Sequence, residues 1–529
     1  MRVASLPAFV ERSGRTAALL GWLLYAGLLV GLFALLPPEL PRLEAASAIL
    51  SFGLVGFWRW AWGAMHLTRS AIYSRLVFPK IRARAEAAAP PPALYVLVTS
   101  YRMPQALNAA VYGRLFDEIA RFGVPTMVVA CVTDHADVLT IERSFARRDL
   151  PEGSRVEIIS QRGKGKRDAM AAALDLMAAD HPPAGAQVVL MDGDTLLGED
   201  ALRKTCAVLT AEPRVGAVTT DNLPIVKGGG FTREWYRARM MQRDNLMGSM
   251  ALSRRLLVLT GRFSVFRARL ATSNGFVNAV AGDHVDHPRL GRIRMLTGDD
   301  KSTWFETLRT GWDMLYVRDV AVHPVEELPA GGFVRASSAL MLRWYGNMVR
   351  SNGRAVALGP KRCGWFLWIA LLDQRLSMWT SLLGPTTAIL LALTQDATVL
   401  TLYLVWVLLS RGVLCALYGL TTGRFHPLFV FALYYNQVVG AAIKIFAYHH
   451  PDRQRWTRQA KTSGGPLTRP SFGARLSGPY LVTSISLFML ATATLSGSLD
   501  AAPSARHPWS LGDALFTPVR HPSVHGPGS

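Results

Sequence analysis

The sequence has few charged residues, and acidic residues are the scarcer kind. Charged residues make up 18% of the 529 positions, against about 25% in an ordinary soluble domain. Because half of the residues are hydrophobic, the composition excludes a disordered chain and a single small soluble domain. The 58 Lys and Arg outnumber the 37 Asp and Glu, and the net charge of +21 favours an anionic partner such as phospholipid head groups or a negatively charged substrate.

Cysteine is also scarce, and no two cysteines form a C-x-x-C pair. This spacing gives no zinc signature and no disulfide framework, so we expect four reduced thiols: Cys131, Cys206, Cys363 and Cys415. The basic residues flank long apolar runs and do not form a stripe interleaved with aromatic residues, which argues against a nucleic-acid partner.

Two apolar runs near the N-terminus, residues 16–36 and 45–67, are each long enough to cross a bilayer. No small-residue cleavage site follows the first run, so we expect an uncleaved transmembrane hairpin within residues 1–69. The second run contains Arg59. This cation either faces a polar path or partner inside the membrane or lies in an aromatic belt at the membrane surface.

In residues 70–363, short apolar stretches alternate with amphipathic ones. This alternation is the pattern of an α/β domain with a largely parallel sheet. Basic residues flank the open end of the N-terminal hairpin, so we expect this domain on the cytoplasmic side of the membrane.

Apolar runs return after the α/β domain. The short run 364–372 has basic residues on both sides and predicts a helix at the membrane interface. The runs 378–393 and 397–420 predict a helical hairpin. The run 427–448 is also flanked by basic residues, and we expect it to lie along the membrane rather than to cross it.

The last apolar run covers residues 480–495. It closes a C-terminal membrane region, residues 364–496, which we expect to combine interface helices with transmembrane helices. Residues 497–529 are rich in Pro, Ser, Gly and His and have the composition of a disordered tail.

Polar residues follow the first two predicted strands, and ligands of open α/β sheets bind beyond the carboxyl ends of strands. The strand at 94–99 ends in Thr99 with Tyr101 close behind, and the next strand is followed by Asp134 and Asp137. We therefore expect these residues to contact a nucleotide, although most strands end in polar residues.

The segment 163–168 opens a helical run with two glycines and two lysines. It is not a P-loop, because the glycine spacing and the terminal Ser or Thr are missing. Backbone N–H groups at a helix start, together with Lys166 and Arg167, suit a diphosphate. The alternative is a solvated basic turn.

Two acid pairs are candidates for the chemistry. An apolar strand runs directly into Asp192 and Asp194, and such carboxylates bind Mg²⁺ or Mn²⁺ together with substrate phosphates, although many Asp-x-Asp pairs are structural. Asp299 and Asp300 open a second helical run, where one carboxylate caps the helix and the other serves as a general base.

Two further groups are less specific. Arg343 and Trp344 offer a bidentate cation for a pyrophosphate and an aromatic face for a sugar, the alternative being a surface helix against lipid head groups. The cluster Asp283, His284, Asp286 and His287 has a spacing compatible with a metal, but such loop residues are more often structural.

In this order, the motifs resemble the processive membrane glycosyltransferases of family 2, which include cellulose, chitin and hyaluronan synthases. The closer resemblance is to the mannuronan synthases, the catalytic subunits of bacterial alginate synthase. It is carried by residues 163–168, 192–195, 297–304, 343–347, 373–381, 434–437 and 452–459.

The resemblance implies a GT-A-like (Rossmann-like) glycosyltransferase domain, inserted between transmembrane helices of a bacterial inner membrane. Its activity would be transfer of mannuronate from GDP-mannuronic acid to a growing β-1,4-linked polymannuronate, with inversion at the sugar carbon and export of the product. Asp300, beside Asp299, would be the base, and Asp192 and Asp194 would hold Mg²⁺ or Mn²⁺ with the donor diphosphate. The nucleotide would contact Thr99 and either Asp134 or Asp137, and the diphosphate would contact Lys166 and Arg343. The acceptor sugar would bind at Thr260, Gly261 and Trp344. A gating loop would contain Trp456, Thr457 and Arg458.

The resemblance also implies partners that the sequence itself does not contain. A separate membrane subunit with a PilZ domain would bind cyclic di-GMP, and periplasmic proteins would complete alginate export. Leu340 stands where most relatives carry Gln, a departure that the mannuronan synthases share. The alternatives are a synthase that uses another sugar nucleotide and a non-catalytic membrane scaffold or transporter.

A polyuronate carries one carboxylate per sugar, and this charge must be paired or desolvated during transport. Five cations lie in or beside the apolar runs, and we expect some of them to line the path: Arg59, Arg350, Arg375, Arg411 and Lys444. The alternative for each is that it reaches toward lipid phosphates.

Overall fold

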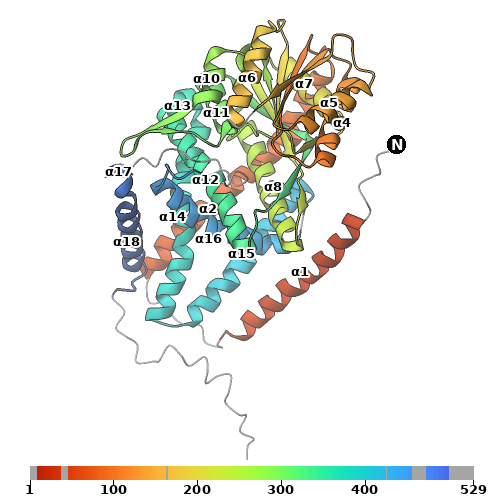
Figure 1. The fold of residues 1–529 in the computed structure, drawn as a ribbon. Coiled ribbons are helices and arrows are strands. Elements are labelled where there is room, and N and C mark those ends of the chain that lie inside the picture. The colour runs from red at the N-terminus through yellow and green to blue at the C-terminus, as the bar shows by residue number, and fades with distance from the viewer. Residues whose placement is uncertain (1–8, 37–45, 162–164, 425, 455–471, 500–529) are drawn as a thin grey trace, which may run out of the picture.

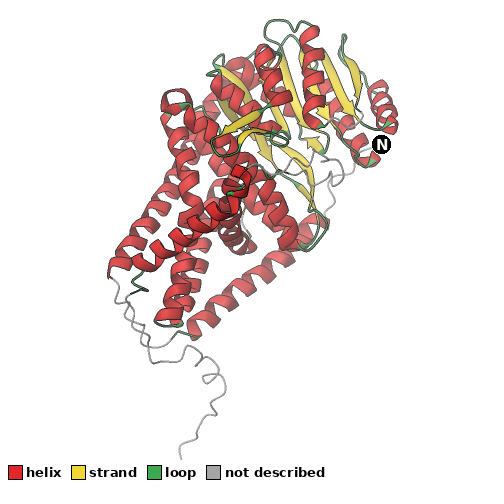
Figure 2. Cartoon of the chain, turned by 60° about the vertical axis from the view of Figure 1, so that its left-hand side comes forward, coloured by secondary structure: helices red, strands yellow, loops and turns green. Residues whose placement is uncertain are grey.

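The computed structural model describes residues 9–36, 46–161, 165–424, 426–454 and 472–499. An α/β domain occupies one end of the molecule, and helices from both ends of the chain form the other end (Figure 1). Figure 2 shows the strands confined to the α/β domain, with the long helices directed away from it.

The α/β domain is built on one mixed sheet of nine strands in the described chain. The strand order is β3-β2-β1-β4-β8-β6-β11-β5, and β7 pairs with β11. The strands are β1 (Leu94–Thr99), β2 (Thr126–Val132), β3 (Arg155–Ser160), β4 (Gln187–Asp192), β5 (Thr195–Leu197), β6 (Val215–Asn222), β7 (Ile225–Lys227), β8 (Phe263–Arg267) and β11 (Asp313–Glu327). A separate hairpin pairs β9 (His284–His287) with β10 (Gly291–Arg294).

The first half of the sheet is parallel, as predicted, whereas β8 and the edge strand β5 pair with their neighbours in antiparallel fashion. Strands β1 to β4 pair in parallel, whereas β8 runs antiparallel to both β4 and β6. The residues of β1, β2 and β4 are rich in Val and Leu and almost fully buried, because helices cover both faces of the sheet.

Helices of the α/β domain connect the strands, and the longest of them face the membrane part. They are α3 (Phe78–Glu86), α4 (Gln105–Phe122), α5 (His135–Ala146), α6 (Lys166–Ala179), α7 (Ala201–Ala211), α8 (Gly230–Ala251), α9 (Ala268–Ala271), α10 (Asn274–Gly282), α11 (Asp299–Arg309), α12 (Phe333–Ala357) and α13 (Gly359–Cys363), with a π-helical turn at Tyr73–Val77. In Figure 1, α8 and α12 lie between the sheet and the helical part.

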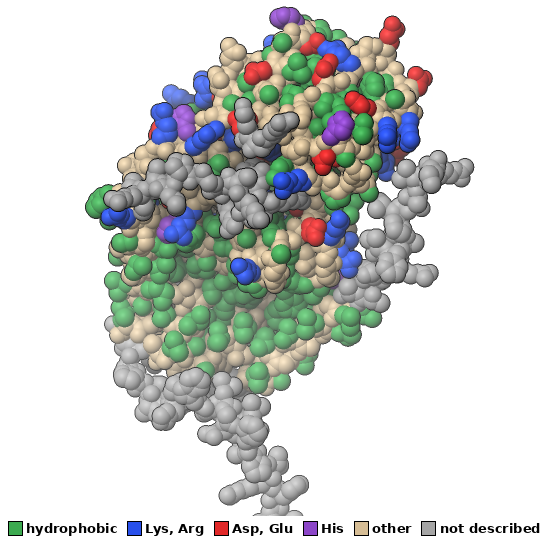
Figure 3. Space-filling view, viewed as in Figure 1, with side chains coloured by type: hydrophobic (Ala, Val, Ile, Leu, Met, Phe, Trp, Pro, Cys, Tyr) green, Lys and Arg blue, Asp and Glu red, His purple; other side chains and the backbone are tan. Residues whose placement is uncertain are grey.

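The helical part has the apolar surface of a membrane protein. Its helices are α1 (Phe9–Ala34), α2 (Ala46–Ile72), α14 (Trp365–Thr394), α15 (Thr398–Thr422), α16 (Leu428–His449), α17 (Phe472–Arg475) and α18 (Ser477–Leu495). Four segments of the described chain are long and apolar enough to cross a membrane: α14, α15, α16 and α17 with α18. Figure 3 shows hydrophobic side chains over this half and Lys and Arg where it meets the α/β domain.

The predicted interface helix at 364–372 is wrong as a separate element, because it is the first part of α14. The polar residues Asp373 and Gln374 that follow it do not end the helix, since both have partners on other helices. Asp373 pairs with Arg59 of α2 at 2.6 Å, and Gln374 accepts a hydrogen bond from Asn352 at 2.6 Å. Residues 365–394 therefore form one helix of 30 residues.

Helix α16 is tied to the α/β domain at both ends and in its middle. Before its start, Arg424 pairs with Asp221 of β6 at 2.5 Å. In the middle, Asn436 accepts a hydrogen bond from Trp235 of α8 at 2.8 Å. Beyond its end, the carbonyl of Pro451 accepts from Arg350 at 3.1 Å. These contacts fix α16 against the α/β domain, and its length and composition also allow it to cross a membrane, so its predicted position along the membrane stays a prediction.

Candidate active site

Two predicted site residues, Thr99 and Asp192, lie side by side at the carboxyl ends of β1 and β4. These strands are parallel neighbours, and Thr99 pairs with Asp192 in their register. The next residue, Gly193, donates its N–H to the carbonyl of Thr99 at 2.9 Å. A Cβ at Gly193 would lie 2.3 Å from the hydroxyl of Ser100, so this close contact between the two strand ends requires glycine.

Three charged side chains from distant segments meet beside this edge. The Nζ of Lys166, at the start of α6, lies 2.6 Å from Asp192 and 2.6 Å from Asp299, at the start of α11. A Cβ at Gly261 would lie 3.5 Å from all three groups, so Gly261 forms the floor of the cluster. The structure thus assembles Lys166, Asp192, Asp299 and Gly261, which lie up to 133 positions apart in the sequence.

The two adjacent acids of α11 have opposite electrostatic environments. Burial acts to raise the pKa of Asp299, but the nearby Lys166 and Arg167 lower it below its ordinary value. Burial raises the pKa of Asp300, and the negative charge of Asp299 raises it further. Asp300 accepts one hydrogen bond from the N–H of Lys301 at 2.9 Å. An aspartate with a raised pKa next to an ionised one suits the predicted general base.

A buried amide supports the turn that carries these acids. Gly298 has a φ of +82°, and a Cβ there would lie 2.8 Å from the side chain of Asn347 on α12. Asn347 accepts hydrogen bonds from Thr297 at 2.6 Å and from Arg350 at 2.7 Å. Arg350 continues to the carbonyl of Pro451, so the turn before Asp299 is connected to the end of α16.

The structure corrects the expectation that Arg167 faces the donor. Its guanidinium is buried and donates to the carbonyls of Val280 and Thr297 at 2.9 and 3.1 Å and to the hydroxyl of Ser302 at 3.0 Å. Arg167 follows Lys166 directly in a helix, so the two side chains point in different directions. Its role here is to hold α6 against α10 and α11.

Thr260 is also engaged inside the domain. Its hydroxyl lies 3.1 Å from the hydroxyl of Thr219 and donates to the carbonyl of Phe263 at 3.3 Å. Thr260 therefore fixes the turn that presents Gly261, and only the glycine lies beside the charged cluster.

The predicted nucleotide residues lie at the ends of β1 and β2. Asp134 caps α5 by accepting from the N–H of Ala136 at 3.0 Å. Asp137 is buried and accepts from Asn108 of α4 at 3.0 Å, and burial raises its pKa. Tyr101 lies beside the guanidinium of Arg102 at 5.4 Å. Thus Asp134 and Tyr101 are more accessible than Asp137.

The predicted acceptor residue Trp344 is part of an aromatic group at the base of the α/β domain. It stacks on Trp235 with ring centroids 6.2 Å apart, and the guanidinium of Arg239 lies 4.3 Å from its ring centroid. Arg343 precedes it on α12, one helical turn before Asn347. The predicted gating motif Trp456, Thr457 and Arg458 lies outside the described residues.

The acid and histidine cluster at 283–287 has a structural explanation. Asp283 accepts two hydrogen bonds from Arg354, one of them at 2.9 Å, and one from Ser302. His284 and Asp286 lie on the exposed β9–β10 hairpin. The described part of the chain has no group of three or more His, Cys, Asp or Glu side chains placed to hold a metal ion by themselves.

The charged cluster nevertheless fits a divalent cation that substrate phosphates would help to hold. The carboxylates of Asp192 and Asp299 already converge on a positive charge, the ammonium of Lys166. Mg²⁺ and Mn²⁺ prefer such oxygen ligands, and Mg²⁺ is commonly bound through one or two carboxylates and the phosphates of a substrate.

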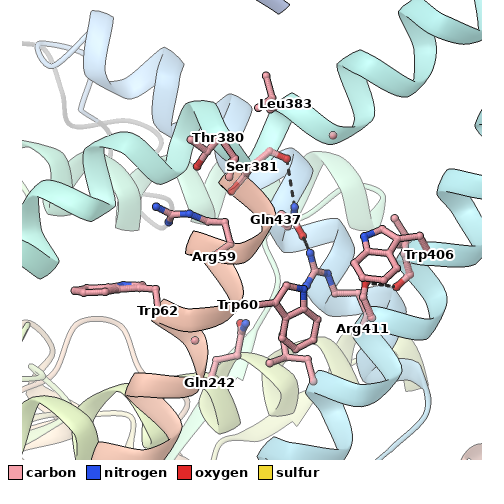
Figure 4. Close-up of a pocket in the computed structure, with 18 of the residues that line it drawn as sticks. Arg59, Trp60, Trp62, Gln242, Thr380, Ser381, Leu383, Trp406, Arg411 and Gln437 are labelled. Atoms are coloured by element: carbon pink, nitrogen blue, oxygen red, sulfur yellow. Dashed lines mark hydrogen bonds between the residues drawn. The ribbon is translucent and has the colours of Figure 1, made fainter. Parts of the chain in front are cut away.

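A cavity of about 840 Å³ lies between α2, α8, α14, α15 and α16 (Figure 4). Its lining includes Leu257, whose carbonyl accepts a hydrogen bond from Lys301 at 2.5 Å, and extends along α14 from Ala370 to Leu391. These 21 helical steps correspond to about 30 Å, similar to the hydrocarbon thickness of a bilayer. The cavity therefore extends from Leu257 and α8 of the α/β domain into the membrane part.

The sequence reasoning missed several residues that hold this site together. Asn347 was visible only as part of the 343–347 motif. Arg262 pairs with Glu326, and the charges of Asp194 and Asp192 also act on its guanidinium. Gln454 accepts a hydrogen bond from the N–H of Leu296 at 3.0 Å, just before the turn that carries Asp299. No local pattern marks these residues, because their partners are up to 158 positions away.

Comparison with known proteins places the α/β domain in a family. Residues 90–347 match the model "Glycosyltransferase like family 2". The chain is 40% identical to "Glycosyltransferase alg8" of Pseudomonas syringae pv. tomato over 442 residues, and 40% identical to "Glycosyltransferase alg8" of Azotobacter vinelandii over 444 residues. Each alignment covers 83% of this chain and 90% of the relative.

Solved structures are more distant. The mannosyltransferase PcManGT from Pyrobaculum calidifontis, determined with GDP-Man and Mn²⁺, is 18% identical with a TM-score of 0.41. That comparison covers 72% of this chain and 98% of the other. The glucosyl-3-phosphoglycerate synthase of Mycobacterium tuberculosis, determined with Mn²⁺, UDP and phosphoglyceric acid, is 14% identical with a TM-score of 0.29, over 54% of this chain and 82% of the other.

Proposed function

The chain belongs to the Alg8 glycosyltransferases of family 2, and from this premise we propose that it polymerises mannuronate from GDP-mannuronic acid and exports the β-1,4-linked product. One observation carries the proposal. The aspartate with the raised pKa lies next to a charged cluster suited to a sugar diphosphate, and a cavity with cationic side chains extends from Leu257 and α8 of the same domain into the membrane part.

The proposed reaction is an inverting transfer. Asp300 removes the proton from the 4-hydroxyl of the acceptor sugar, and the hydroxyl oxygen attacks C1 of the donor. The bond between C1 and the diphosphate breaks as the new glycosidic bond forms, and GDP leaves. Attack opposite to the leaving group inverts the configuration at C1.

The charged cluster would stabilise the leaving diphosphate. Asp192 and Asp194 would hold Mg²⁺ or Mn²⁺, which when bound neutralises charge on the diphosphate. Lys166 lies between the two acid pairs, and its ammonium contributes positive charge at the same place. Thr99, Tyr101 and Asp134 lie on the side where we place the nucleotide. Arg343 and Trp344 remain proposed contacts of the diphosphate and the acceptor.

We place the enzyme in a bacterial inner membrane, with the α/β domain in the cytoplasm, where the sugar nucleotide is available. A PilZ subunit that binds cyclic di-GMP and periplasmic export proteins remain proposed partners. A second candidate function is a synthase of the same architecture that uses another sugar nucleotide, because no described residue in the charged cluster distinguishes mannuronate from other sugars.

The test is incorporation of radiolabel by membranes that contain the full chain. GDP-mannuronate, GDP-mannose and UDP-sugars are supplied separately to wild type, to Asp300→Asn and to a control, Asp175→Asn, which changes an exposed carboxylate on α6. We expect polymer from GDP-mannuronate only, loss of it in Asp300→Asn and normal activity in the control. Incorporation only from a UDP-sugar would overturn the donor, and full activity of Asp300→Asn would overturn the base.

A further inference from the structure

The cavity in the membrane part is unusually rich in positive charge for a site surrounded by apolar helices. The described residues that line it include four cations and one carboxylate, so its lining carries a formal charge of +3. These residues are Arg59, Arg243, Arg411, Lys444 and Asp373. Charged groups inside a membrane protein are costly, and they usually mark a polar ligand or path.

One of the cations is already neutralised. The guanidinium of Arg59 donates to both carboxylate oxygens of Asp373, at 2.6 and 3.3 Å, and the indole N–H of Trp58 donates to the same carboxylate at 3.3 Å. Arg59 and Asp373 together therefore contribute no net charge to the cavity. The expectation that Arg59 faces a polar partner holds, but this partner belongs to the protein.

Arg411 differs from Arg59, because its hydrogen-bond partner is neutral. Its guanidinium donates to the side-chain oxygen of Gln437, which in turn donates to the carbonyl of Ser381 at 3.3 Å (Figure 4). The Nε of Arg411 is buried without a hydrogen-bond partner among the described residues. Burial of a guanidinium without a carboxylate is unfavourable, so the charge is placed for an anion that comes from outside the protein.

Lys444 extends the same arrangement toward the α/β domain. Its ammonium lies 4.7 Å from the ring centroid of Tyr345, the neighbour of Trp344, and forms no ion pair within the described chain. Lys444 follows Gln437 by two turns of α16, or about 10 Å along the helix axis. The two cations therefore follow one another along the cavity from the proposed acceptor site inward.

We propose that Arg411 and Lys444 are two successive binding positions for the carboxylates of a translocating polyuronate. The inference rests on the proposed function and identifies the cations that recognise its product. Arg411 offers a planar fork that suits a carboxylate, and Lys444 offers a single point charge. Trp60 and Trp406 also line the cavity and supply apolar faces for sugar rings. The remaining predicted cations are elsewhere: Arg350 binds Asn347, and Arg375 lies against Gly353 of α12.

The experiment compares product length in proteoliposomes that contain the full chain and are supplied with labelled GDP-mannuronate. The variants are Arg411→Gln and Lys444→Gln, with Arg411→Lys to restore the charge. Arg375→Gln is the matched control outside the cavity lining. Chain length is measured by gel filtration and normalised to total incorporated label, which separates early release of product from slow synthesis.

We expect chains about tenfold shorter in Arg411→Gln and in Lys444→Gln, because loss of a charge-assisted contact speeds release of the chain. Arg411→Lys should recover most of the length, and Arg375→Gln should give chains of wild-type length. If both Gln variants give wild-type chains, or if Arg375→Gln shortens them equally, the inference is overturned although the proposed function stands. If the wild type makes no polymer from GDP-mannuronate, both are overturned. If Arg411→Gln makes no polymer at all, the result for Arg411→Lys is used instead. Long chains in Arg411→Lys would support a role of the positive charge in holding the product, and absence of polymer would contradict it.

Discussion

Replacement of Lys166 by Gln tests whether the charged cluster works as one electrostatic unit. The ammonium lies 2.6 Å from an oxygen of Asp192 and 2.6 Å from an oxygen of Asp299, and both carboxylates are less than one-third exposed. Without it, two negative charges at most about 5 Å apart would repel each other by about 3 kcal/mol at an effective dielectric constant of about 20.

This repulsion changes the protonation of the pair. It corresponds to roughly a hundredfold change in a proton-binding constant, since 1.4 kcal/mol is a factor of ten. In Lys166→Gln the pKa of Asp299 should rise, because Lys166 lowers it in the wild type. As the pH is lowered, Asp299 would then become protonated at a higher pH than in the wild type. The acidic limb of the pH–rate profile should therefore move to higher pH, and higher concentrations of Mg²⁺ or Mn²⁺ should partly restore activity.

The assay is the initial rate of polymer synthesis across a pH series at several divalent-cation concentrations. Lys166→Arg keeps the charge and should retain the wild-type acidic limb, even if its rate is lower. Lys80→Gln removes an exposed lysine of α3 and controls for the general loss of one positive charge. An acidic limb that is identical in Lys166→Gln and the wild type would refute the reasoning.

Three further predictions concern the surrounding residues. Asp300→Asn should lower the rate of polymer synthesis about 10²- to 10⁴-fold while GDP-mannuronate binding persists, and the raised pKa of Asp300 should make wild-type activity fall at a higher pH than for a free aspartate. Unchanged kinetics would contradict that role. Asn347→Ala removes a buried acceptor of two hydrogen bonds and should destabilise the domain by about 1–3 kcal/mol, measured by thermal unfolding, with Asn352→Ala on the same helix for comparison. Gly193→Ala should abolish activity and lower thermal stability, because its Cβ would overlap the hydroxyl of Ser100; a wild-type melting temperature would show that the strand ends move apart easily.

Much of the α/β domain follows from local sequence patterns. The apolar stretch before Thr99 is strand β1 with the predicted bounds, and the apolar run before Asp192 is strand β4. These predictions succeed because buried parallel strands need continuous apolar residues, which are visible locally. The antiparallel β8 is different, since strand direction depends on where the chain returns to the sheet.

The candidate site could be predicted as a set of residues but not as a geometry. The pairing of Lys166 with Asp299 joins residues 133 positions apart, and the pairing of Arg59 with Asp373 joins residues 314 positions apart. The second pairing also explains the error at 364–372. The sequence alone shows charged residues directly after this run and so favours a short helix, whereas Arg59 on α2 neutralises Asp373 and the helix continues.

The four cysteines have a practical consequence for mapping this protein in a bilayer. All four thiols are buried and therefore shielded from thiol reagents, and burial raises the pKa of Cys131 in β2 to about 12, so this thiol is protonated at neutral pH. A cysteine introduced at an exposed position would then be the main site of maleimide labelling, with no need to remove the native ones first. Membrane-impermeant and membrane-permeant reagents applied to such single-site variants would report directly which side of the bilayer each loop occupies.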